Sequence, residues 1–124
     1  AGIFMHGGGY GAFTPAMLVY HERGMITHPE VRAVTLSKLD LGASRVLWDV
    51  GAGSGSVALE AALLYPSLKA YAVERNEKRF SNINKNIEKL GTKRVEAVFG
   101  DILGVSDNLP DPDRVFLGGG GNSL

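Results

Sequence analysis

The sequence predicts an α/β fold built on a mostly parallel sheet of about four strands. Short apolar runs alternate with helical segments between residues 46 and 117, and a glycine-rich turn at residues 51–55 leads from the first run into a helix. Strands that alternate with helices form parallel sheets with right-handed crossovers. The chain has 124 residues, which is enough for one domain and too few for two.

The first regular element is a predicted helix over residues 27–40. Thr27 and Glu30 have the spacing of a capping box, and Pro29 fits the first helical turn because its missing N–H would be unpaired there. Apolar residues then recur at helical spacing. Residues 1–23 show no clear period, and we interpret them as an N-terminal arm of uncertain structure in front of a domain at residues 24–124. A phosphate-binding loop at residues 6–11 is the weaker interpretation, because nothing shows a strand entering it and no Gly-Lys-Ser/Thr follows.

The remaining elements follow from apolar runs and the residues that end them. Strands are predicted at residues 46–50, 70–73, 95–99 and 114–117. Helices are predicted at residues 56–65, ended by Pro66, and at 76–90, ended by Gly91. A linker rich in Asp and Pro separates the third and fourth strands, and residues 108–113 are expected to form a tight turn. Trp48 lies inside the first strand and is expected to belong to the core.

The composition excludes several classes of function. Thirteen basic and 13 acidic residues give a net charge of zero, so we expect no nucleic-acid partner held by bulk charge. The chain has no cysteine, which excludes a disulfide framework, a cysteine nucleophile and thiolate metal ligands. The three histidines have no metal-binding spacing, and no metal is expected.

The same composition bears on where the protein works. No apolar run approaches the ~20 residues of a membrane span, and no signal peptide is visible at residues 1–10. We therefore expect a cytoplasmic protein with no membrane partner.

Four candidate binding features lie at the carboxyl ends of the predicted strands, where open parallel sheets bind ligands. The glycine loop follows the first strand and lets the backbone approach a ligand closely. Glu74 ends the second strand and can accept hydrogen bonds from both hydroxyls of a ribose. Asp101 follows the third strand and could meet the exocyclic amine of adenine, although Asp101 alone would more often be a turn residue. Residues 118–121 are four glycines after the fourth strand.

The spacing within the glycine loop favours S-adenosylmethionine over NAD. A dinucleotide fingerprint would place its third glycine at position 56, where this chain has Ser56. Asp49 stands two residues before Gly51, and its carboxylate would repel a pyrophosphate. A ligand that carries an ammonium or sulfonium group would not be repelled. The basic residues of the 78–94 stretch are interleaved with acidic ones and are read as a solvated helix face.

Several stretches resemble one enzyme family. They are residues 26–27 with 30–39, then 47–56, 73–76 and 109–116. Together they are similar to the precorrin-6Y methyltransferase (decarboxylating) and cobalt-precorrin methyltransferase family of cobalamin biosynthesis. The likeness covers about residues 24–122, and it is most specific at residues 30–33 and 110–116.

The resemblance implies a Rossmann-like class I methyltransferase fold that uses S-adenosylmethionine. It also implies methylation of a corrinoid precursor with loss of carbon dioxide from an acetate side chain. The cofactor-binding residues implied are Thr27, Asp49, Gly51, Ala52, Gly53, Ser54, Gly55, Glu74, Asp101 and Ile102. The substrate-side loop implied is Gly118, Gly119, Gly120 and Gly121, with Gly120 in place of a usual serine. No residue is identified as catalytic.

The family also sets expectations for assembly. Its members are tetrameric, so a homo-oligomer is expected, and they continue with further helices and three more strands, so the domain is expected to be incomplete. The fourth strand should lie beside the first, with Val115, Phe116 and Leu117 on an exposed edge that favours pairing with another chain.

Two other functions stay open. One is a methyltransferase for another substrate. Adenine and exocyclic-amine methylases usually carry an Asp/Asn-Pro-Pro-aromatic motif where this chain has glycines, which argues against them. The other is a non-catalytic fragment that only binds S-adenosylmethionine.

Overall fold

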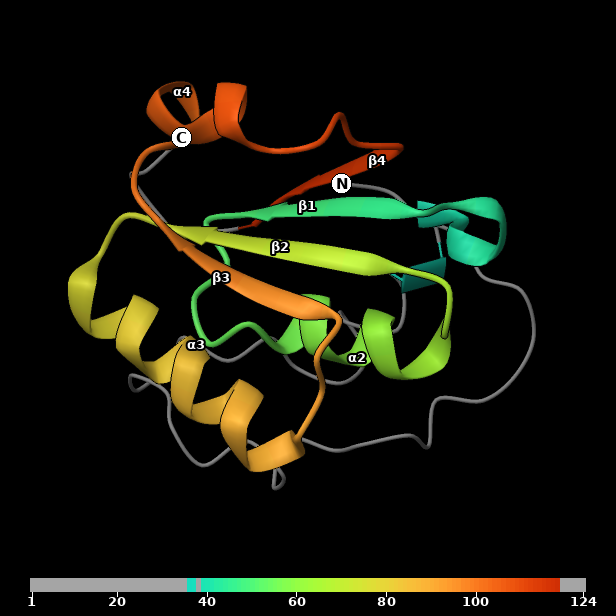
Figure 1. Ribbon diagram of the computed structural model, residues 1–124, viewed down its shortest axis with the longest axis horizontal. Coiled ribbons are helices and arrows are strands. Elements are labelled where there is room, and N and C mark those ends of the chain that lie inside the picture. The colour runs from blue at the N-terminus through green and yellow to red at the C-terminus, as the bar shows by residue number, and fades with distance from the viewer. Residues whose placement is uncertain (1–35, 38, 119–124) are drawn as a thin grey trace.

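The computed structural model describes residues 36, 37 and 39–118, and Figure 1 shows their arrangement. Four strands form one sheet in the order β3-β2-β1-β4. They are β1 (Val46–Val50), β2 (Lys69–Glu74), β3 (Val95–Phe99) and β4 (Arg114–Leu117). All neighbouring strands are parallel. The predicted α/β fold is therefore confirmed, as is the position of the fourth strand beside the first.

Two helices cover one face of this sheet. Helices α2 (Ser56–Leu64) and α3 (Glu77–Leu90) lie on the same side of the strands in Figure 1. Helix α2 packs on β1, β2 and β3, and α3 packs on β2 and β3. Leu47, Ala70 and Val95 share one register across the sheet. They are buried together with Leu59 of α2 and Ile83 of α3, and this cluster is the core that holds the strands in place.

The segment between β3 and β4 contains two short helices that the sequence analysis did not predict. Helix α4 (Ile102–Val105) begins directly after Asp101, and η3 (Ser106–Asn108) follows it. The expected linker was therefore wrong over its first part. Helix α4 has only four residues and contains Gly104, so it carries no apolar period that a sequence could display.

The bounds of α2, β2 and α3 differ from the predicted ones by one residue at one or both ends. Helix α3 begins at Glu77, because Asn76 is its N-cap and accepts a hydrogen bond from Arg79 N at 3.0 Å. Leu36, Ser37 and Leu39 are helical, in agreement with the end of the predicted helix over 27–40, and η2 (Leu41–Ala43) leads into β1. Residues 1–35 and 119–124, which include Thr27, the predicted arm and Gly119 to Gly121, lie outside the described residues.

Trp48 is only half-buried, which corrects its assignment to the core. Its indole Nε1 donates a hydrogen bond to Pro110 O at 3.0 Å. The side chain therefore ties the segment before β4 to β1 from the face of the sheet opposite to Leu47.

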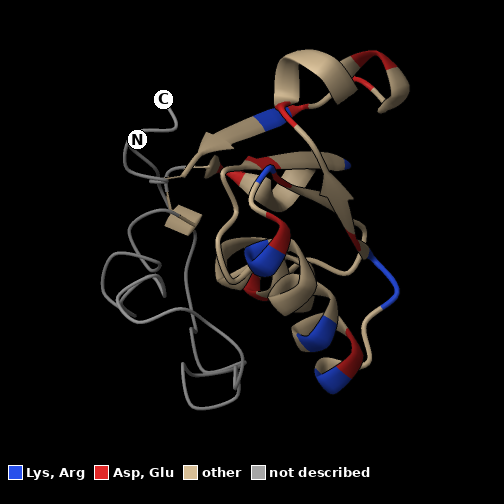
Figure 2. Cartoon of the chain, turned by 90° about the vertical axis from the view of Figure 1, so that its left-hand side faces the viewer, with Lys and Arg blue, Asp and Glu red and all other residues tan. Residues whose placement is uncertain are grey.

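Arg94 also differs from the solvated helix face that its sequence context suggests. Its Nη1 atom donates to the carbonyl oxygens of Ala62, Tyr65 and Leu68. These carbonyls lie at the end of α2 and in the turn that follows it, so a cation there satisfies acceptors that the helix leaves unpaired. Along α3 the expected interleaving of basic and acidic residues can be followed in the colours of the ribbon in Figure 2.

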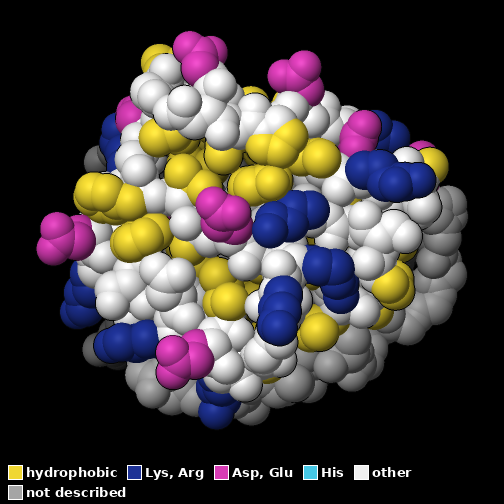
Figure 3. Space-filling model, viewed as in Figure 1, with side chains coloured by type: hydrophobic (Ala, Val, Ile, Leu, Met, Phe, Trp, Pro, Cys, Tyr) yellow, Lys and Arg dark blue, Asp and Glu magenta, His cyan; other side chains and the backbone are white. Residues whose placement is uncertain are grey.

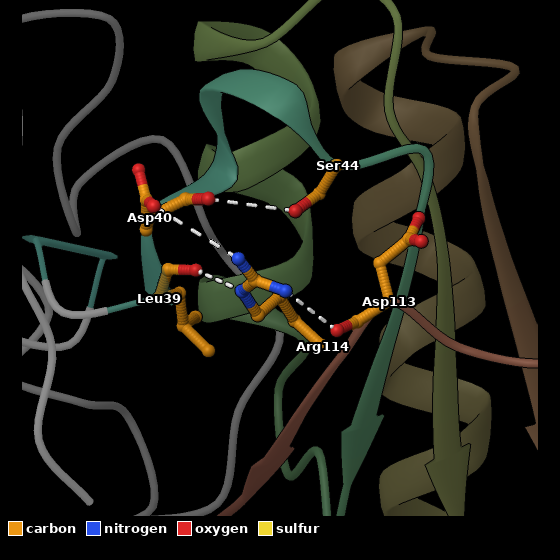
Figure 4. Close-up of polar contacts among 5 residues, drawn as sticks. All are labelled: Leu39, Asp40, Ser44, Asp113 and Arg114. Carbon is orange, nitrogen blue, oxygen red and sulfur yellow. Dashed lines mark hydrogen bonds and ion pairs between the residues drawn. The ribbon is translucent and has the colours of Figure 1, made fainter.

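Polar contacts fix the amino ends of β1 and β4 against one another. Asp113 Oδ2 accepts from Arg45 N at 2.6 Å and from Val46 N at 2.8 Å. Arg114 Nε donates to Leu39 O at 2.8 Å, and its Nη2 lies 3.9 Å from Asp40 Oδ2, as Figure 4 shows. These contacts join segments that are distant in sequence. The tight turn expected at residues 108–113 is not present: Asn108 is the last residue of η3, and residues 109–113 are irregular with bends at both ends.

The opposite face of the sheet is less covered. Val115 and Leu117 of β4 are 45% and 55% exposed, and Leu103 of α4 is 89% exposed. Figure 3 shows hydrophobic side chains gathered on the upper part of the face in view. Parallel sheets usually have both faces covered, so this part of the described chain offers apolar surface for further packing.

Candidate cofactor site at the carboxyl ends of the strands

The loop between β1 and α2 has a backbone that only glycine adopts easily. Gly51, Gly53 and Gly55 have φ values of 71°, 61° and 83°. These values lie in the left-handed region, where a side chain is strained. The alternation of glycine with Ala52 and Ser54 is thus a requirement of the loop's shape. Gly51 N and Ala52 N both donate to Val73 O, at 2.9 and 3.1 Å, which fixes the loop to the end of β2.

Gly118 lies directly against this loop. Its N–H donates to Val50 O at 2.7 Å, and a Cβ atom at Gly118 would lie 2.8 Å from Gly51 O. That distance is shorter than real Cβ contacts allow, and the opposing atom is backbone. Position 118 therefore admits no side chain without moving the glycine loop, which links the predicted substrate-side loop to the predicted cofactor loop.

Glu74 is the residue that joins the loop to α3. Its side chain is buried at the end of β2. Oε1 accepts from Gly53 N at 2.9 Å, and Oε2 accepts from Asn76 N at 3.0 Å. Each carboxylate oxygen can accept a second hydrogen bond, so the carboxylate organises the loop and retains capacity for ribose hydroxyls.

Asp49 lies beneath the loop and is buried. Its Oδ2 accepts from Ala58 N, in the first turn of α2, at 3.2 Å. Burial raises the pKa of Asp49 to about 7; the hydrogen bond from Ala58 lowers it, and the charge of Glu74 raises it further. Two carboxylates therefore stand close to one another at the base of the loop, where a cation would offset their repulsion.

Ser54 carries an unused polar group in the same loop. Its Oγ is buried and has no hydrogen-bond partner among the described residues, whereas its carbonyl oxygen accepts from Asn86 Nδ2 at 2.9 Å. A buried hydroxyl without a partner is uncommon, because it forfeits the hydrogen bonds it makes in water. An orphaned hydroxyl is consistent with a loop that gains a partner when it binds a ligand.

An open cleft lies in front of these residues, with about 380 Å³ of empty space including its mouth. Four residues proposed from the sequence line it: Gly51, Glu74, Asp101 and Ile102. Val50, Val73, Arg75 and Gly100 also line it and were not singled out as site residues. The sequence could have indicated them by their position alone, because each is adjacent to a proposed residue at a strand end. The other proposed residues of the glycine loop and Asp49 are not among the residues that line it.

Asp101 has a defined orientation at the rim of the cleft. Its Oδ1 accepts from Leu103 N at 2.9 Å, which makes it the N-cap of α4, and Oδ2 lies 3.6 Å from Arg75 Nη1. Asp101 therefore does have the local structural role, in the turn after β3, that its sequence position predicts. The orientation leaves the adenine role open, because a carboxylate accepts more than these two contacts.

Within residues 36–37 and 39–118, no group of three or more His, Asp or Glu side chains could hold a metal ion. No helix of that described region is long and apolar enough to cross a membrane.

Comparison with known families identifies the chain. A family model described as "Precorrin methyltransferase domain" matches residues 18–124. The chain belongs to this family. The recognition drawn from the glycine loop and from residues 109–116 is thereby confirmed.

Individual relatives of this precorrin methyltransferase domain agree. A probable cobalt-precorrin-6B C(15)-methyltransferase (decarboxylating) of Pyrobaculum calidifontis is 46% identical over 101 residues, covering 80% of this chain and 52% of the relative. The crystal structure of precorrin-6y C5,15-methyltransferase from Geobacter metallireducens superposes with a TM-score of 0.77 at 46% identity, covering 82% of this chain and 54% of that one.

A more distant structure, PigF with SAH, has a TM-score of 0.52 at 26% identity and covers 63% of this chain and 23% of that one. The precorrin methyltransferase domain spans between a quarter and about half of the length of the first curated relatives that it matches. The Rossmann-like class I methyltransferase fold is thus common to these proteins and to this chain.

Proposed function

We propose that this chain is the cofactor-binding part of an S-adenosylmethionine-dependent methyltransferase. Its substrate would be a corrinoid precursor of the precorrin-6Y or 6B type in cobalamin biosynthesis, with associated decarboxylation. The observation that carries the proposal is the cleft at the strand ends, where Glu74 and Asp101 stand beside a glycine loop in a precorrin methyltransferase domain.

The residues present fit this cofactor. Glu74 would accept from the ribose hydroxyls, and Asp101, with Ile102 beside it, would receive the adenine. The loop from Gly51 to Gly55 would receive the amino-acid part, with the buried carboxyl of Asp49 acting from beneath the loop and Ser54 Oγ offering a free hydrogen-bonding group. Thr27 is proposed as a further contact, by family resemblance. When bound, the cofactor supplies an electrophilic methyl group.

The chain's own residues would act by position. Methyl transfer depends mainly on holding the methyl group near a nucleophilic ring carbon. We propose that Gly118 to Gly121 face the corrinoid, because the contact of Gly118 with Gly51 and Val50 places the start of that loop beside the cofactor loop. The catalytic residues and the decarboxylating residue stay unassigned.

We further propose that residues 24–124 are the cofactor-binding domain, that residues 1–23 precede it as an arm, and that the protein is a cytoplasmic homo-oligomer, tetrameric by family resemblance. The exposed Val115 and Leu117 on β4 support association. Light scattering on a sizing column at micromolar concentration tests it, and a well-folded monomer would contradict it.

Calorimetry tests the binding proposal. The chain is titrated with S-adenosylmethionine, S-adenosylhomocysteine and NAD, and the first two are expected to bind more tightly than NAD. Equal or better binding of NAD would overturn the proposal. Transfer of a labelled methyl group to a cobalt-precorrin-6B preparation then separates a working methyltransferase from a fragment that only binds cofactor.

A further inference from the structure

The exposed ion pair at the cleft rim carries an inference that rests on the proposed function. Arg75 follows Glu74 directly and lines the same cleft, and its Nη1 lies 3.6 Å from Asp101 Oδ2. The two side chains are 53% and 51% exposed. Exposed ion pairs add little to stability, so the main effect of this pair is on the position of the Asp101 carboxylate at the cleft.

The pair restricts how the Asp101 carboxylate can turn. An exposed carboxylate held by one hydrogen bond rotates about its side-chain bonds. Here the Leu103 N–H fixes Oδ1 and the Arg75 guanidinium draws Oδ2. These two contacts favour one direction of the remaining lone pairs relative to the cleft, which Ile102 and Gly100 also line.

We propose that Arg75 is a positioning residue that holds Asp101 ready to accept a hydrogen bond from a 6-amino purine. A hydrogen-bond acceptor held in this place raises the affinity for a ligand that donates to it and lowers the affinity for a ligand that presents a second acceptor there. The cleft therefore selects adenine over hypoxanthine, and Arg75 sharpens the selection without itself hydrogen-bonding the amine.

The test compares two ligands that differ only at this atom, S-adenosylhomocysteine and S-inosylhomocysteine. Calorimetry on the unaltered chain is expected to show a preference of about 10-fold or more for the adenosyl compound. Arg75→Met keeps much of the side-chain stem but removes the charge, and it should reduce that preference about 2- to 5-fold. Arg75→Lys should retain most of it. Added salt should lower the preference of the unaltered chain and leave that of Arg75→Met unchanged.

Two controls separate the possible failures. Arg45→Met makes the same change at an exposed arginine at the other end of the sheet, and it should not alter the preference. Asp101→Asn should abolish the preference, because an amide can pair with either base. If Arg75→Met weakens both ligands equally, or leaves their ratio unchanged, the positioning role is wrong. If S-adenosylhomocysteine does not bind the unaltered chain, the proposed function itself fails.

Discussion

Each end of the sheet has a carboxylate that accepts hydrogen bonds from two backbone N–H groups, but only one of the two carboxylates lines the cleft. At the carboxyl end, the Glu74 carboxylate accepts from two backbone N–H groups, Gly53 N and Asn76 N. At the amino end, the Asp113 carboxylate accepts from Arg45 N and Val46 N. Glu74 is buried and lines the cleft, whereas Asp113 is exposed and far from it in the strand direction.

The difference teaches how to separate binding from folding in this domain. A carboxylate on backbone N–H groups aligns two segments wherever it occurs. It contributes to ligand binding only where a cleft leaves its remaining lone pairs within reach of a ligand. Substitutions at the carboxyl end should therefore change affinity, and those at the amino end should change stability alone.

The largest expected effect concerns Asp49, which lies at the carboxyl end but is enclosed. Its pKa is raised from 3.8 to about 7, so between these values the folded state binds the proton that the unfolded state releases. The contribution of Asp49 therefore destabilises the fold increasingly as the pH rises from about 4 to about 7. Asp49→Asn keeps an acceptor for Ala58 N without the charge and should raise the free energy of unfolding at pH 8 by about 1–4 kcal/mol.

Urea unfolding at pH 5 and pH 8 measures this gain. The difference between the variant and the unaltered chain should be larger at pH 8 than at pH 5. An equal difference at both values would show that Asp49 does not titrate as its burial indicates.

The next effect is on affinity. Glu74→Ala should weaken binding of S-adenosylhomocysteine about 10- to 150-fold, because hydrogen bonds to a charged group contribute about 1.5–3 kcal/mol. The loss includes the order that Glu74 gives the glycine loop. Glu77→Ala, at the first residue of α3, should change the binding free energy by less than about 0.5 kcal/mol. Calorimetry on both variants gives the comparison, and equal affinities would rule out the ribose role.

Arg94 provides a matched test at the amino end. Arg94→Met removes the donor to the carbonyls of Ala62, Tyr65 and Leu68 and should lower the free energy of unfolding by about 1–2 kcal/mol. Lys93→Met changes an exposed neighbour and should have little effect. Urea denaturation measures both. Ligand affinity should be unchanged in either variant. A loss of affinity in Arg94→Met would contradict the idea that substitutions at the amino end change stability alone.

The smallest effect is expected at Asp113, which is exposed. Asp113→Asn should lower the urea midpoint modestly and leave ligand affinity as it is. The N–H groups of Arg45 and Val46 hold the pKa of Asp113 below its ordinary value, so its stabilising contribution is present above about pH 4 and disappears as the pH falls further. Unfolding at pH 7 and pH 3 should show the variant and the unaltered chain converging in acid.

The sequence predicts the parts of this fold that local patterns encode. The bounds of β1, β3 and β4 follow from apolar runs, and the cleft residues Gly51, Glu74 and Asp101 follow from the rule that ligands bind at strand ends. The contacts of Asp113 and Arg94 could not be foreseen, because their partners lie 67 and 32 residues away along the chain. Asp49 was interpreted as a group facing the ligand, and only the packing of α2 reveals its enclosure.

Trp48 gives this domain an optical reporter of its own. It is the chain's one tryptophan, and its indole hydrogen bond to Pro110 O couples its emission to the docking of the segment that enters β4. Exciting it at the red edge of its absorption avoids the four tyrosines. A shift of emission to longer wavelength then records the moment when that segment leaves β1, without any label attached.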